Sequence, residues 1–540
     1  MITNLNPYPA YKDSGVPWLG KVPEHWEVRR LGASVRACIN GVWGSEPDGY
    51  NDLICVRVAD FDRYRRRVRL IRPTVRSIPL DDRTHRLLCP GDLLLEKSGG
   101  GDQQLVGMVV LYDHPVKAVC SNFIARMPVS EGYDPSFLNY LHAALYAIQL
   151  NLRSIKQTTG IQNLDSKAYL GELVAFPPLL EQTAIVRFLD YMDRRIRSYI
   201  RAKQKLIKLL EEYRQALIHQ AVTGKIDVRT GQPYPAYKDS GVPWLGQVPE
   251  HWEVRRLGSV THILNGATPS SSRPECWDGH IVWITPDDLG KLKGRYIDNS
   301  SRLITQEGYN ACGTTLAPAG SIVISTRAPI GHLGILRVAA CANQGCRLLV
   351  PQAATASEYL YQVLAAARPS LEVLGQGSTF LELSRSKLGI FPIPFPPLPE
   401  QTAIVEYLDA QTAKLDAAIA AARREIELLR EYRERLIADV VTGKVDVREV
   451  AAQLPEEPPE EEVGTEEEEV AAEELATVDS QEESNGEEQI NIEASGDPGT
   501  AGCPGRRDCA LSGARWLGQA GRPAGKGHHL AQLKPDGGAL

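Results

Sequence analysis

The sequence predicts a mixed α/β protein in which two globular domains alternate with two long helices. Three observations support this fold class: a domain-sized internal repeat, two long amphipathic stretches, and short strand-like runs between them. A chain of 540 residues is long enough for several domains with hydrophobic cores of their own. The predicted order is a first domain at 1–176, a helix at 177–226, a second domain at 227–395, a helix at 396–449 and a tail at 450–540.

The repeat consists of conserved blocks separated by variable sequence. The head motif at 8–32 reads YPAYKDSGVPWLGKVPEHWEVRRLG, and 234–258 repeats it with Gln247 in place of Lys21 as the only difference. The variable segments that follow lead into FPPLxEQTAIV, and each unit closes with VTGKxDVR. Units of this size exclude a short-period solenoid. Such alternation is expected if constant parts build one architecture and variable parts meet two different targets, although duplication without functional meaning gives the same pattern.

Each conserved block predicts a long helix. Neither glycine nor proline occurs between Pro178 and Gly224, and these two residues suit a helix start and a C-terminal cap. Apolar residues recur at alternating steps of four and three, a heptad pattern that would give a helix about 60 Å long. The apolar stripe is buried either against the second copy or in the core of its own domain. The predicted helix-pair interface comprises Ile185, Leu189, Met192, Ile196, Leu206, Leu210 and Leu217 with Ile404, Leu408, Leu415, Ile419, Ile426, Leu429 and Leu436.

The variable segments predict compact mixed α/β units of one fold. Short apolar runs bounded by turn residues are typical of strands, and a longer stretch near the end of each segment is typical of a helix. In the first segment the strands are expected at 53–58, 92–95 and 107–112 and the helix near 135–152. In the second segment the strands are expected at 281–284, 321–325, 334–338 and 347–350 and the helix at 357–366. Because the order of elements matches, we expect diverged copies of a single domain.

Charge is divided unevenly along the chain. The whole chain carries a net charge of −7, but the residues after Val450 contain 20 acidic and 6 basic side chains, which leaves 1–450 at +7. Residues 455–497 contain 18 acidic side chains among Pro, Gly, Ser and Ala, a composition typical of disorder, and 498–540 show no periodicity. A mildly basic body is compatible with DNA as a partner.

Cysteines and apolar runs point to the cytoplasm. The ten cysteines are scattered, without a CxxC pair or a Cys/His zinc spacing, as expected of thiols in a reducing compartment. The N-terminus shows no secretory signal, and no run of about 18 apolar residues could span a membrane. We therefore expect a cytoplasmic protein without a membrane partner.

No reaction motif accompanies this architecture. A DNA methyltransferase needs an Asn/Asp-Pro-Pro-aromatic motif, whereas the Pro-Pro pairs here follow Phe176 and Phe395. No phosphate-binding GxxxxGK[ST] loop occurs. The acidic pair Asp287-Asp288 lacks the acid-x-Lys element of a metal-dependent nuclease. The sequence therefore predicts a chain without catalytic, cofactor-binding or metal-ligating residues of its own.

Side chains that could contact DNA occur in a basic run and in several loops. The run could neutralise phosphates, although a solvated strand face would look the same. Reading of base edges requires polar side chains held on loops. The candidates are Arg63, Arg65, Arg66, Arg67, Lys97, Ser98, Gln103, Gln157 and Thr158 in the first segment, and Thr268, Ser270, Arg273, Arg327, Gln376, Ser378 and Thr379 in the second.

The head motifs, the FPPLxEQTAIV block, the VTGKxDVR ending and their two-fold repetition resemble the specificity subunit of type I restriction-modification systems. The resemblance spans about residues 8–449 and leaves out the tail. It implies two target-recognition domains, each of which reads one half of a bipartite double-stranded DNA site. It also implies that the two conserved helices pack antiparallel as a coiled coil, which makes the molecule pseudo-two-fold. The helix length would then set the spacer between half-sites, which must suit DNA turns of about 34 Å.

The resemblance implies partners as well. It predicts docking of two modification subunits, which methylate adenine, and of ATP-dependent restriction subunits. S-adenosylmethionine, ATP and Mg would then be bound by those partners, with no cofactor in this chain. No individual base contact is transferred, and His25, Trp26, His251 and Trp252 are expected to pack where domains meet helices. Two alternatives from other classes are a stand-alone repeated DNA-binding regulatory protein and an enzyme with a cryptic active site.

Overall fold

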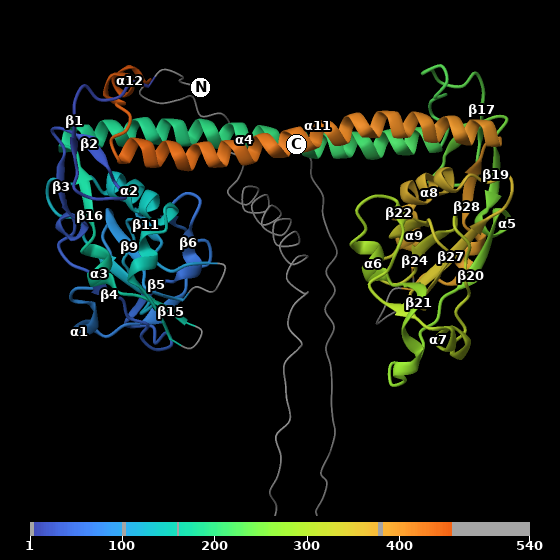
Figure 1. Ribbon diagram of the computed structural model, residues 1–540, viewed down its shortest axis with the longest axis horizontal. Coiled ribbons are helices and arrows are strands. Elements are labelled where there is room, and N and C mark those ends of the chain that lie inside the picture. The colour runs from blue at the N-terminus through green and yellow to red at the C-terminus, as the bar shows by residue number, and fades with distance from the viewer. Residues whose placement is uncertain (1–4, 100–103, 159–160, 376–381, 456–540) are drawn as a thin grey trace, which may run out of the picture. The chain divides into compact units, whose positions relative to one another are not determined.

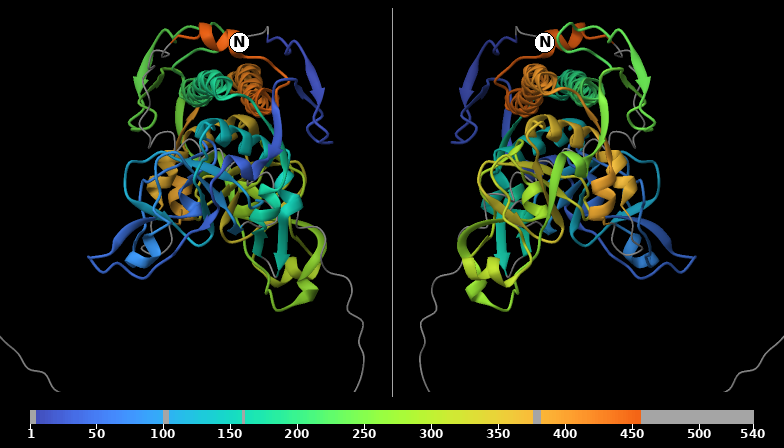
Figure 2. Two further views of the ribbon diagram at one scale, coloured as in Figure 1. Left: turned by 90° about the vertical axis from the view of Figure 1, so that its left-hand side faces the viewer. Right: turned by 90° about the vertical axis from the view of Figure 1, so that its right-hand side faces the viewer.

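Two helices of the same length lie at the centre of this computed structural model, which describes residues 5–99, 104–158, 161–375 and 382–455 (Figure 1). They are α4 (Leu179–Val222) and α11 (Leu398–Val441), each of 44 residues. Ion pairs join Lys203 to Glu425 at 2.6 Å and Arg214 to Asp416 at 3.3 Å, so residue numbers fall along α11 as they rise along α4. The two helices therefore run antiparallel, and the end-on views in Figure 2 show them side by side.

Both helices begin and end at the residues that the sequence singles out. Pro178 and Pro397 precede the first turns, where a missing N–H leaves no hydrogen bond unmade. Gly224 and Gly443 follow the last turns with φ of +71° and +77°, a left-handed conformation that glycine adopts without strain. A Cβ at Gly224 would lie 2.4 Å from Pro249, and a Cβ at Gly443 would lie 2.4 Å from Pro23. These caps are therefore pressed against the head motifs.

Most of the predicted interface residues lie in apolar clusters that include both helices. These residues are Ile185, Leu189, Met192, Ile196, Leu217, Ile404, Leu408, Leu415, Ile426, Leu429 and Leu436. The structure differs from the prediction in the middle of α4, where Leu206 is 42% exposed while Ile200 and Ile207 pack against α11. The physical reason is that a helix of 3.6 residues per turn drifts by about 20° per heptad from a strict seven-residue repeat. Ile419 is buried outside these clusters, and Leu210 is only half-buried.

Each head motif folds into a hairpin and one further strand that closes its domain. The strands are β1 (Tyr11–Asp13) with β2 (Lys21–Pro23) and β3 (Glu27–Arg30) with β16 (Leu173–Phe176) in the first copy, then β17 (Tyr237–Asp239) with β18 (Gln247–Pro249) and β19 (Glu253–Arg256) with β28 (Pro392–Phe395) in the second. All four pairs are antiparallel. Because β16 leads into α4 and β28 leads into α11, each head ties the beginning of its domain to the helix that follows it.

The first domain contains a six-stranded sheet in the order β4-β13-β9-β11-β7-β6 and two three-stranded sheets, β12-β5-β8 and β10-β15-β14. The strands are β4 (Ile39–Asn40), β5 (Asp52–Val56), β6 (Phe61–Asp62), β7 (Arg67–Val68), β8 (Val75–Ser77), β9 (Asp92–Glu96), β10 (Ser98–Gly99), β11 (Val109–Tyr112), β12 (Ala118–Cys120), β13 (Ile124–Met127), β14 (Ile155–Thr158) and β15 (Ile161–Leu164). The helices are η1 (Leu31–Ser34), η2 (Val58–Asp60), α1 (Leu80–Arg83), α2 (Pro135–Ala147), η3 (Leu150–Ser154) and α3 (Ser166–Leu170).

The second domain contains a five-stranded sheet, β20-β27-β24-β25-β22, and a three-stranded sheet, β23-β21-β26. The strands are β20 (Thr261–Asn265), β21 (Trp277–Ile284), β22 (Tyr296–Ile297), β23 (Leu303–Ile304), β24 (Ile322–Ser325), β25 (Leu333–Leu336), β26 (Ala340–Ala342) and β27 (Cys346–Pro351). The helices are α5 (Leu257–Val260), η4 (Pro274–Cys276), α6 (Pro286–Gly290), α7 (Gln306–Ala311), α8 (Ser357–Ala366), α9 (Arg368–Leu374) and α10 (Arg385–Ile390).

The two domains share one strand order. The sheet β20-β27-β24-β25-β22 repeats β4-β13-β9-β11-β7, and β23-β21-β26 repeats β8-β5-β12. The direction of pairing agrees as well, since β7–β11 and β22–β25 are both parallel, as are β5–β12 and β21–β26. The mixed α/β class and the common fold expected for the variable segments are therefore confirmed.

Each domain core extends into both helices. Phe137 of α2 belongs to one apolar cluster with Ile185, from the start of α4, and Val440, from the end of α11. Tyr359 of α8 belongs to another cluster with Leu217, from the end of α4, and Ile404, from the start of α11. Opposite ends of the helix pair therefore hold the two domains (Figure 1). None of the helices described is long and apolar enough to cross a membrane.

Candidate nucleic-acid interface

Polar loops meet at the end of the central strands of the first domain. Lys97 follows β9, and its Nζ donates to Asn40 Oδ1 at 2.6 Å. The Ser98 hydroxyl donates to Asn163 Oδ1 at 2.6 Å, and the two residues face each other across β10 and β15. We call Asn40, Lys97, Ser98 and Asn163 the first polar loop cluster. Strand β14, which carries the candidates Gln157 and Thr158, lies in the same small sheet, so residues far apart in sequence are brought together.

The second domain has a corresponding set of loops. Thr268 donates to the side chain of Gln344, and Arg327 lies 3.4 Å from Glu382, with which it also forms an isolated bridge. Arg347 lies in β27, three residues after Gln344, and its Nη1 donates to the Gln344 carbonyl at 3.0 Å. We call Thr268, Arg327, Gln344, Arg347 and Glu382 the second polar loop cluster.

The two clusters occupy the same place in the fold. Leu164 N–H donates to the Lys97 carbonyl at 2.8 Å, and Leu383 N–H donates to the Thr326 carbonyl at 2.8 Å, which puts equivalent loops in register. The neighbouring loops are also seated alike. A Cβ at Gly41 would lie 2.1 Å from the Cys120 carbonyl oxygen, and a Cβ at Gly266 would lie 1.8 Å from that of Asn343. Only glycine permits this close approach, which brings Asn40 and Thr268 up to their clusters.

The second polar loop cluster is electropositive. Burial lowers the pKa of the half-buried Arg347 guanidinium, and repulsion from Arg327 and Arg385 lowers it further, while Glu382 opposes the shift. The Arg347 Nε is buried and makes no hydrogen bond to any residue that the structure describes. The charges of Arg327 and Arg385 act on Arg347 together with the single carboxylate of Glu382, an environment that favours an anion such as a phosphate.

The basic run of the first domain is paired within the protein. Arg63 contacts Glu96 at 2.9 Å, Arg65 lies 3.9 Å from Asp62, and Arg67 contacts Asp113. Arg66 is 5% exposed and lies 3.4 Å from Asp193 of α4. The structure thus places Arg66 inside the domain–helix junction, where its side chain cannot reach a ligand at the surface. The other three arginines lie beside carboxylates that offset their charge.

The remaining candidates fall into two groups. Ser270 and Arg273 lie on the exposed loop before η4, where Arg273 pairs with Glu275 and Glu307, both at 2.7 Å. That loop follows Thr268 but forms its own contacts. Gln103, Gln376, Ser378 and Thr379 lie outside the described residues.

Several residues of the clusters were not singled out from the sequence. Asn40, Asn163, Gln344 and Glu382 come from loops and strand ends that carry no glycine- or serine-rich signal. An alignment of the two variable segments on their shared strand order would have found these residues. That alignment depends on the fold, because the direct sequence similarity between the segments is weak.

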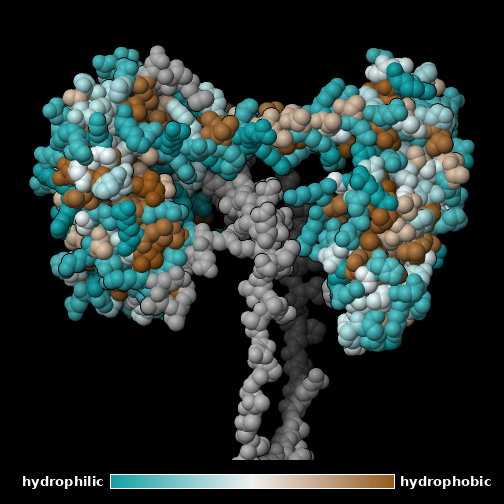
Figure 3. Space-filling view, in the orientation of Figure 1, coloured by the Kyte–Doolittle hydropathy of each residue, from teal (hydrophilic) through white to brown (hydrophobic). Residues whose placement is uncertain are grey.

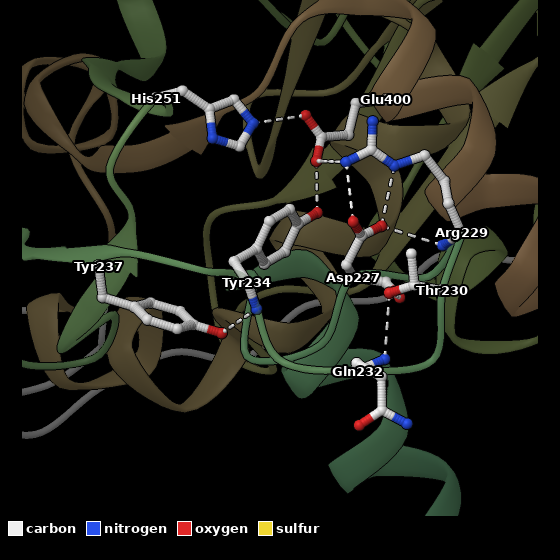
Figure 4. A network of polar contacts seen from close by, with 8 residues as sticks. All are labelled: Asp227, Arg229, Thr230, Gln232, Tyr234, Tyr237, His251 and Glu400. Atoms are coloured by element: carbon white, nitrogen blue, oxygen red, sulfur yellow. Dashed lines mark hydrogen bonds and ion pairs between the residues drawn. The ribbon is translucent and has the colours of Figure 1, made fainter.

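The conserved heads pack at the domain–helix junctions. In the first copy, buried Glu181 of α4 accepts hydrogen bonds from the Tyr8 hydroxyl at 2.6 Å and from Trp26 Nε1 at 2.9 Å, and it lies 2.7 Å from His25. In the second copy, Glu400 of α11 contacts Tyr234, His251 and Arg229, as Figure 4 shows. The expected packing role of these conserved residues is confirmed.

The middle of the helix pair exposes apolar side chains (Figure 3). We call them the helix-pair patch: Tyr199, Leu206, Leu209 and Tyr213 on α4 and Leu428 on α11, which are between 42% and 58% exposed. The patch borders a groove that Tyr199 and Leu428 line together with Lys203 and Glu425. Exposed apolar patches of this kind on a helix surface are typical of contact sites for other proteins.

The described part of the chain shows no metal-binding site. No group of three or more His, Cys, Asp or Glu side chains there is arranged to hold a metal ion. The eight cysteines that the structure describes are free thiols.

Comparison with known proteins finds one family model that matches part of the chain. Residues 249–428 match the type I restriction modification DNA specificity domain. The specificity subunit of the type I restriction enzyme MjaIX from Methanocaldococcus jannaschii is 36% identical over 30% of this chain, and the match covers 38% of that relative, less than half its length. A putative specificity subunit, MjaX, from the same organism is 23% identical, and the match covers 80% of this chain and 96% of that relative.

The fold is shared with a solved structure. A chain from a structure that addresses complex assembly and conformational transition of the type I R-M system superimposes with a TM-score of 0.60. It is 20% identical in sequence, and the match covers 78% of this chain and 98% of that one. At this level of identity the likeness concerns the fold.

Proposed function

We propose that this chain belongs to the family of type I restriction-modification specificity subunits and that it reads a bipartite DNA target with one half-site per domain. The observation that carries the proposal is the pair of polar loop clusters, which occupy equivalent places in two copies of one fold. Because the clusters differ in every side chain, each reads a different half-site sequence. Lys97 and Ser98 in the first, and Thr268 and Arg327 in the second, offer the donors and acceptors that base edges and phosphates require.

The length of the helix pair sets the length of the DNA spacer between the two half-sites. Helices of 44 residues are about 66 Å long at 1.5 Å per residue, close to two turns of B-DNA at about 34 Å each. Supporting a coiled-coil arrangement, Ile196, Ile200 and Ile426 pack together at the middle of the pair. Equivalent junctions at Glu181 and Glu400 support a pseudo-two-fold relation between the two halves. Such a relation turns a tandem repeat into two domains that approach one duplex in the same manner.

The chain also serves as a scaffold. The helix-pair patch lies on the conserved helices, away from the variable loops, as suits a surface that must dock the same partner whatever the target. We assign it to modification subunits, two per chain by the pseudo-two-fold relation. ATP-dependent restriction subunits join the same complex. S-adenosylmethionine, ATP and Mg are bound on these partners, and this chain contributes recognition without catalysis.

Genome-wide mapping of methylated adenines tests the proposal. The host is compared with and without this gene, under conditions in which the modification subunit is present. The expected result is a split motif with a fixed gap that disappears when the gene is deleted. An unchanged methylation pattern, or a continuous motif, would contradict the proposal.

A second measurement separates the alternatives. Purified chain incubated with DNA and S-adenosylmethionine should transfer no methyl groups until a modification subunit is added. Transfer by the chain alone would indicate an enzyme. Tight sequence-specific DNA binding by the chain alone, without any stimulation by a modification subunit, would favour a stand-alone regulatory protein.

A further inference from the structure

The first domain is fastened to the helices by a buried ionic cluster. Asp193 of α4 is 8% exposed, and its Oδ1 accepts a hydrogen bond from Arg433 Nε of α11 at 2.5 Å. Arg66 of the first domain donates to the same oxygen at 3.4 Å, and Arg197 of α4 donates to Oδ2 at 3.1 Å. One carboxylate thus joins the domain to both helices at a single point.

The segment that delivers Arg66 is held from several sides. Arg66 has φ of +59°, a left-handed conformation that persists in a non-glycine residue only when surrounding contacts enforce it. Its carbonyl accepts hydrogen bonds from Asn139 Nδ2 and from Leu111 N–H, both at 3.0 Å. Tyr64 lies two residues before Arg66. Its carbonyl accepts a hydrogen bond from Arg433 Nη2 at 2.7 Å, and its ring lies under the Arg433 guanidinium. The turn between β6 and β7 is therefore clamped onto α11.

The cluster keeps Asp193 ionised despite its burial. Burial raises the pKa of the Asp193 carboxyl, but Arg433, Arg66 and Arg197 outweigh this effect, so that its pKa lies below the ordinary value. Removing one member of such a buried network leaves an uncompensated charge, which is far more costly than losing an exposed ion pair.

The second copy lacks this carboxylate. Thr412 of α11 stands at the position equivalent to Asp193, is 7% exposed, and its hydroxyl donates only to the Leu408 carbonyl of its own helix. Arg214 of α4, equivalent to Arg433, lies 3.3 Å from Asp416, a residue whose side chain is 57% exposed. Arg295 of the second domain reaches Asp409, whose side chain is 44% exposed.

The second junction is less completely hydrogen-bonded. Arg295 Nη1 is buried and makes no hydrogen bond to the described residues, and Arg214 Nε lies 3.3 Å from Asp416 as an ion pair without a hydrogen bond. Burial raises the pKa of Tyr361 of α8 and the charges of both arginines lower it, so both guanidinium groups act on this side chain. The site is thus arranged like the first one, with its central anion missing.

We propose that Asp193 is a positioning residue that locks the first domain to the helix pair, while the second domain, with Thr412 in its place, is the one that adjusts when DNA is engaged. This inference rests on the proposed function where it concerns DNA. With one domain locked and the other held without the buried carboxylate, the protein tolerates small changes in the twist and length of the spacer between half-sites. Specificity for the spacing is therefore set at residues that touch no DNA.

Hydrogen exchange of the full chain, without DNA or partners, tests the lock directly. Backbone protection is compared for the segment 61–68, which contains Arg66, and for 294–297, which contains Arg295. We expect protection about 10-fold higher in 61–68, since opening there breaks the buried cluster. Asp193→Asn should lower the protection of 61–68 by about 10-fold and leave 294–297 unchanged.

The repeat supplies a gain-of-function variant and a matched control. Thr412→Asp places a carboxylate beside Arg214 and Arg295 and should raise the protection of 294–297 by about 10-fold. Thr402→Asp makes the same substitution at an exposed position of α11 and should change neither segment. Equal protection of the two segments in the unmodified chain, or no response to Thr412→Asp, would overturn the proposal.

A panel of DNA duplexes then tests the consequence for recognition. The complex with the modification subunit is given its own target with the spacer lengthened or shortened by one base pair. Thr412→Asp should reduce methylation of the altered spacers relative to the natural one, and Asp193→Asn should increase it. If exchange responds as expected but the spacer preference of both variants is unchanged, the link to spacing is wrong. If the complex without substitutions methylates no split target, the proposed function is wrong. The exchange data then test by themselves whether Asp193 locks the first domain to the helix pair.

Discussion

Asn6 and Asp446 pair as an antiparallel bridge, in which the Asp446 N–H donates to the Asn6 carbonyl at 2.8 Å. In the second copy the same bond runs from Asp227 to Gln232, within one continuous segment that links α4 to the second head. In the first copy this bridge joins the beginning of the described fold to its end, whereas in the second copy it lies within one segment of the chain. The two repeats are therefore connected to each other in space in the same way at both junctions.

Circular permutation should accordingly preserve the fold. Residues 234–448 would be joined to 8–229 through a copy of the natural linker 230–233, Thr-Gly-Gln-Pro. We expect the thermal unfolding midpoint to fall by no more than about 5 °C, because the linker supplies a bridge partner for Asp446 and nearly all of both domain cores is retained. A chain opened instead within α4, between Lys203 and Gln204, serves as the comparison and should lose most of its cooperative unfolding.

Glu181 should be required for stability at the first head. Glu181→Gln removes the charge that the Tyr8 hydroxyl and Trp26 Nε1 donate to, at a site where the side chain is almost fully buried. We expect a loss of about 1.5–3 kcal/mol in the free energy of unfolding, the usual contribution of hydrogen bonds to a charged group. Denaturant titration provides the measurement, with the exposed Glu406→Gln on α11 as the control. Equal stability of the two variants would argue against the junction as a source of stability.

Acid should destabilise the protein through His142. Burial lowers the pKa of His142 from 6.5 to about 3, so the folded state holds it neutral. Its contribution to stability is complete above pH 6.5 and declines toward pH 3, because the unfolded chain takes up a proton that the folded chain cannot, at about 1.4 kcal/mol per pH unit.

The test is the difference in Tm between the unmodified protein and His142→Gln. The variant should be less stable at pH 8, and the difference should shrink steadily as the pH falls to 5. His262→Gln, at an exposed histidine, is the matched control substitution. A constant difference for His142→Gln would show that the histidine does not titrate as expected.

Lys97 and Arg327 should act on different half-sites. Each lies in its own polar loop cluster, so Lys97→Ala should weaken binding of the complex to one half-site and Arg327→Ala to the other. A lost base contact costs about 1–3 kcal/mol, roughly 10- to 100-fold in affinity. The measurement is binding to targets in which one half-site is scrambled. The penalty of each substitution should vanish for one scrambled target and persist for the other, while Arg337→Ala, at an exposed arginine paired with Asp298, should have little effect.

A charge in the helix-pair patch should prevent assembly. Leu209 is 52% exposed on α4, and Leu209→Glu would place a carboxylate in the apolar contact with a modification subunit. We expect co-purification with that subunit to be lost while the thermal unfolding midpoint of the free chain stays the same. Leu180→Glu, at an 89% exposed residue of the same helix, is the control and should leave assembly intact. Normal assembly of Leu209→Glu would place the contact elsewhere.

Much of the secondary structure could be predicted because it depends on local pattern. The helix expected between Pro178 and Gly224 extends from Leu179 to Val222, and the helix expected at 357–366 has those bounds as α8. Proline and glycine mark the ends of α4 through their own backbone preferences, which need no tertiary information. The position of Leu206 could not be predicted in the same way, since which face of a long helix is buried depends on the drift accumulated along its partner.

The candidate site was predicted only in part. Lys97 and Thr268 were found because glycine- and serine-rich loops beside strands indicate exposed polar positions. Arg66 looked like a surface cation, and nothing near it in the sequence reveals that Asp193 and Arg433 bury it. Contacts between residues so distant in the chain follow from the fold, and a basic run cannot be interpreted without them.

The near identity of the two heads has a consequence for inheritance. Their single difference, Lys21 against Gln247, falls on exposed side chains. Both domain–helix junctions therefore offer the same set of contacts to a domain that recombination places there. Recombination between these stretches of the gene could exchange or duplicate a reading domain without disturbing the frame that receives it. New target sequences would then arise by shuffling ready-made parts, and a domain moved to the other junction would gain or lose the fastening that Asp193 provides.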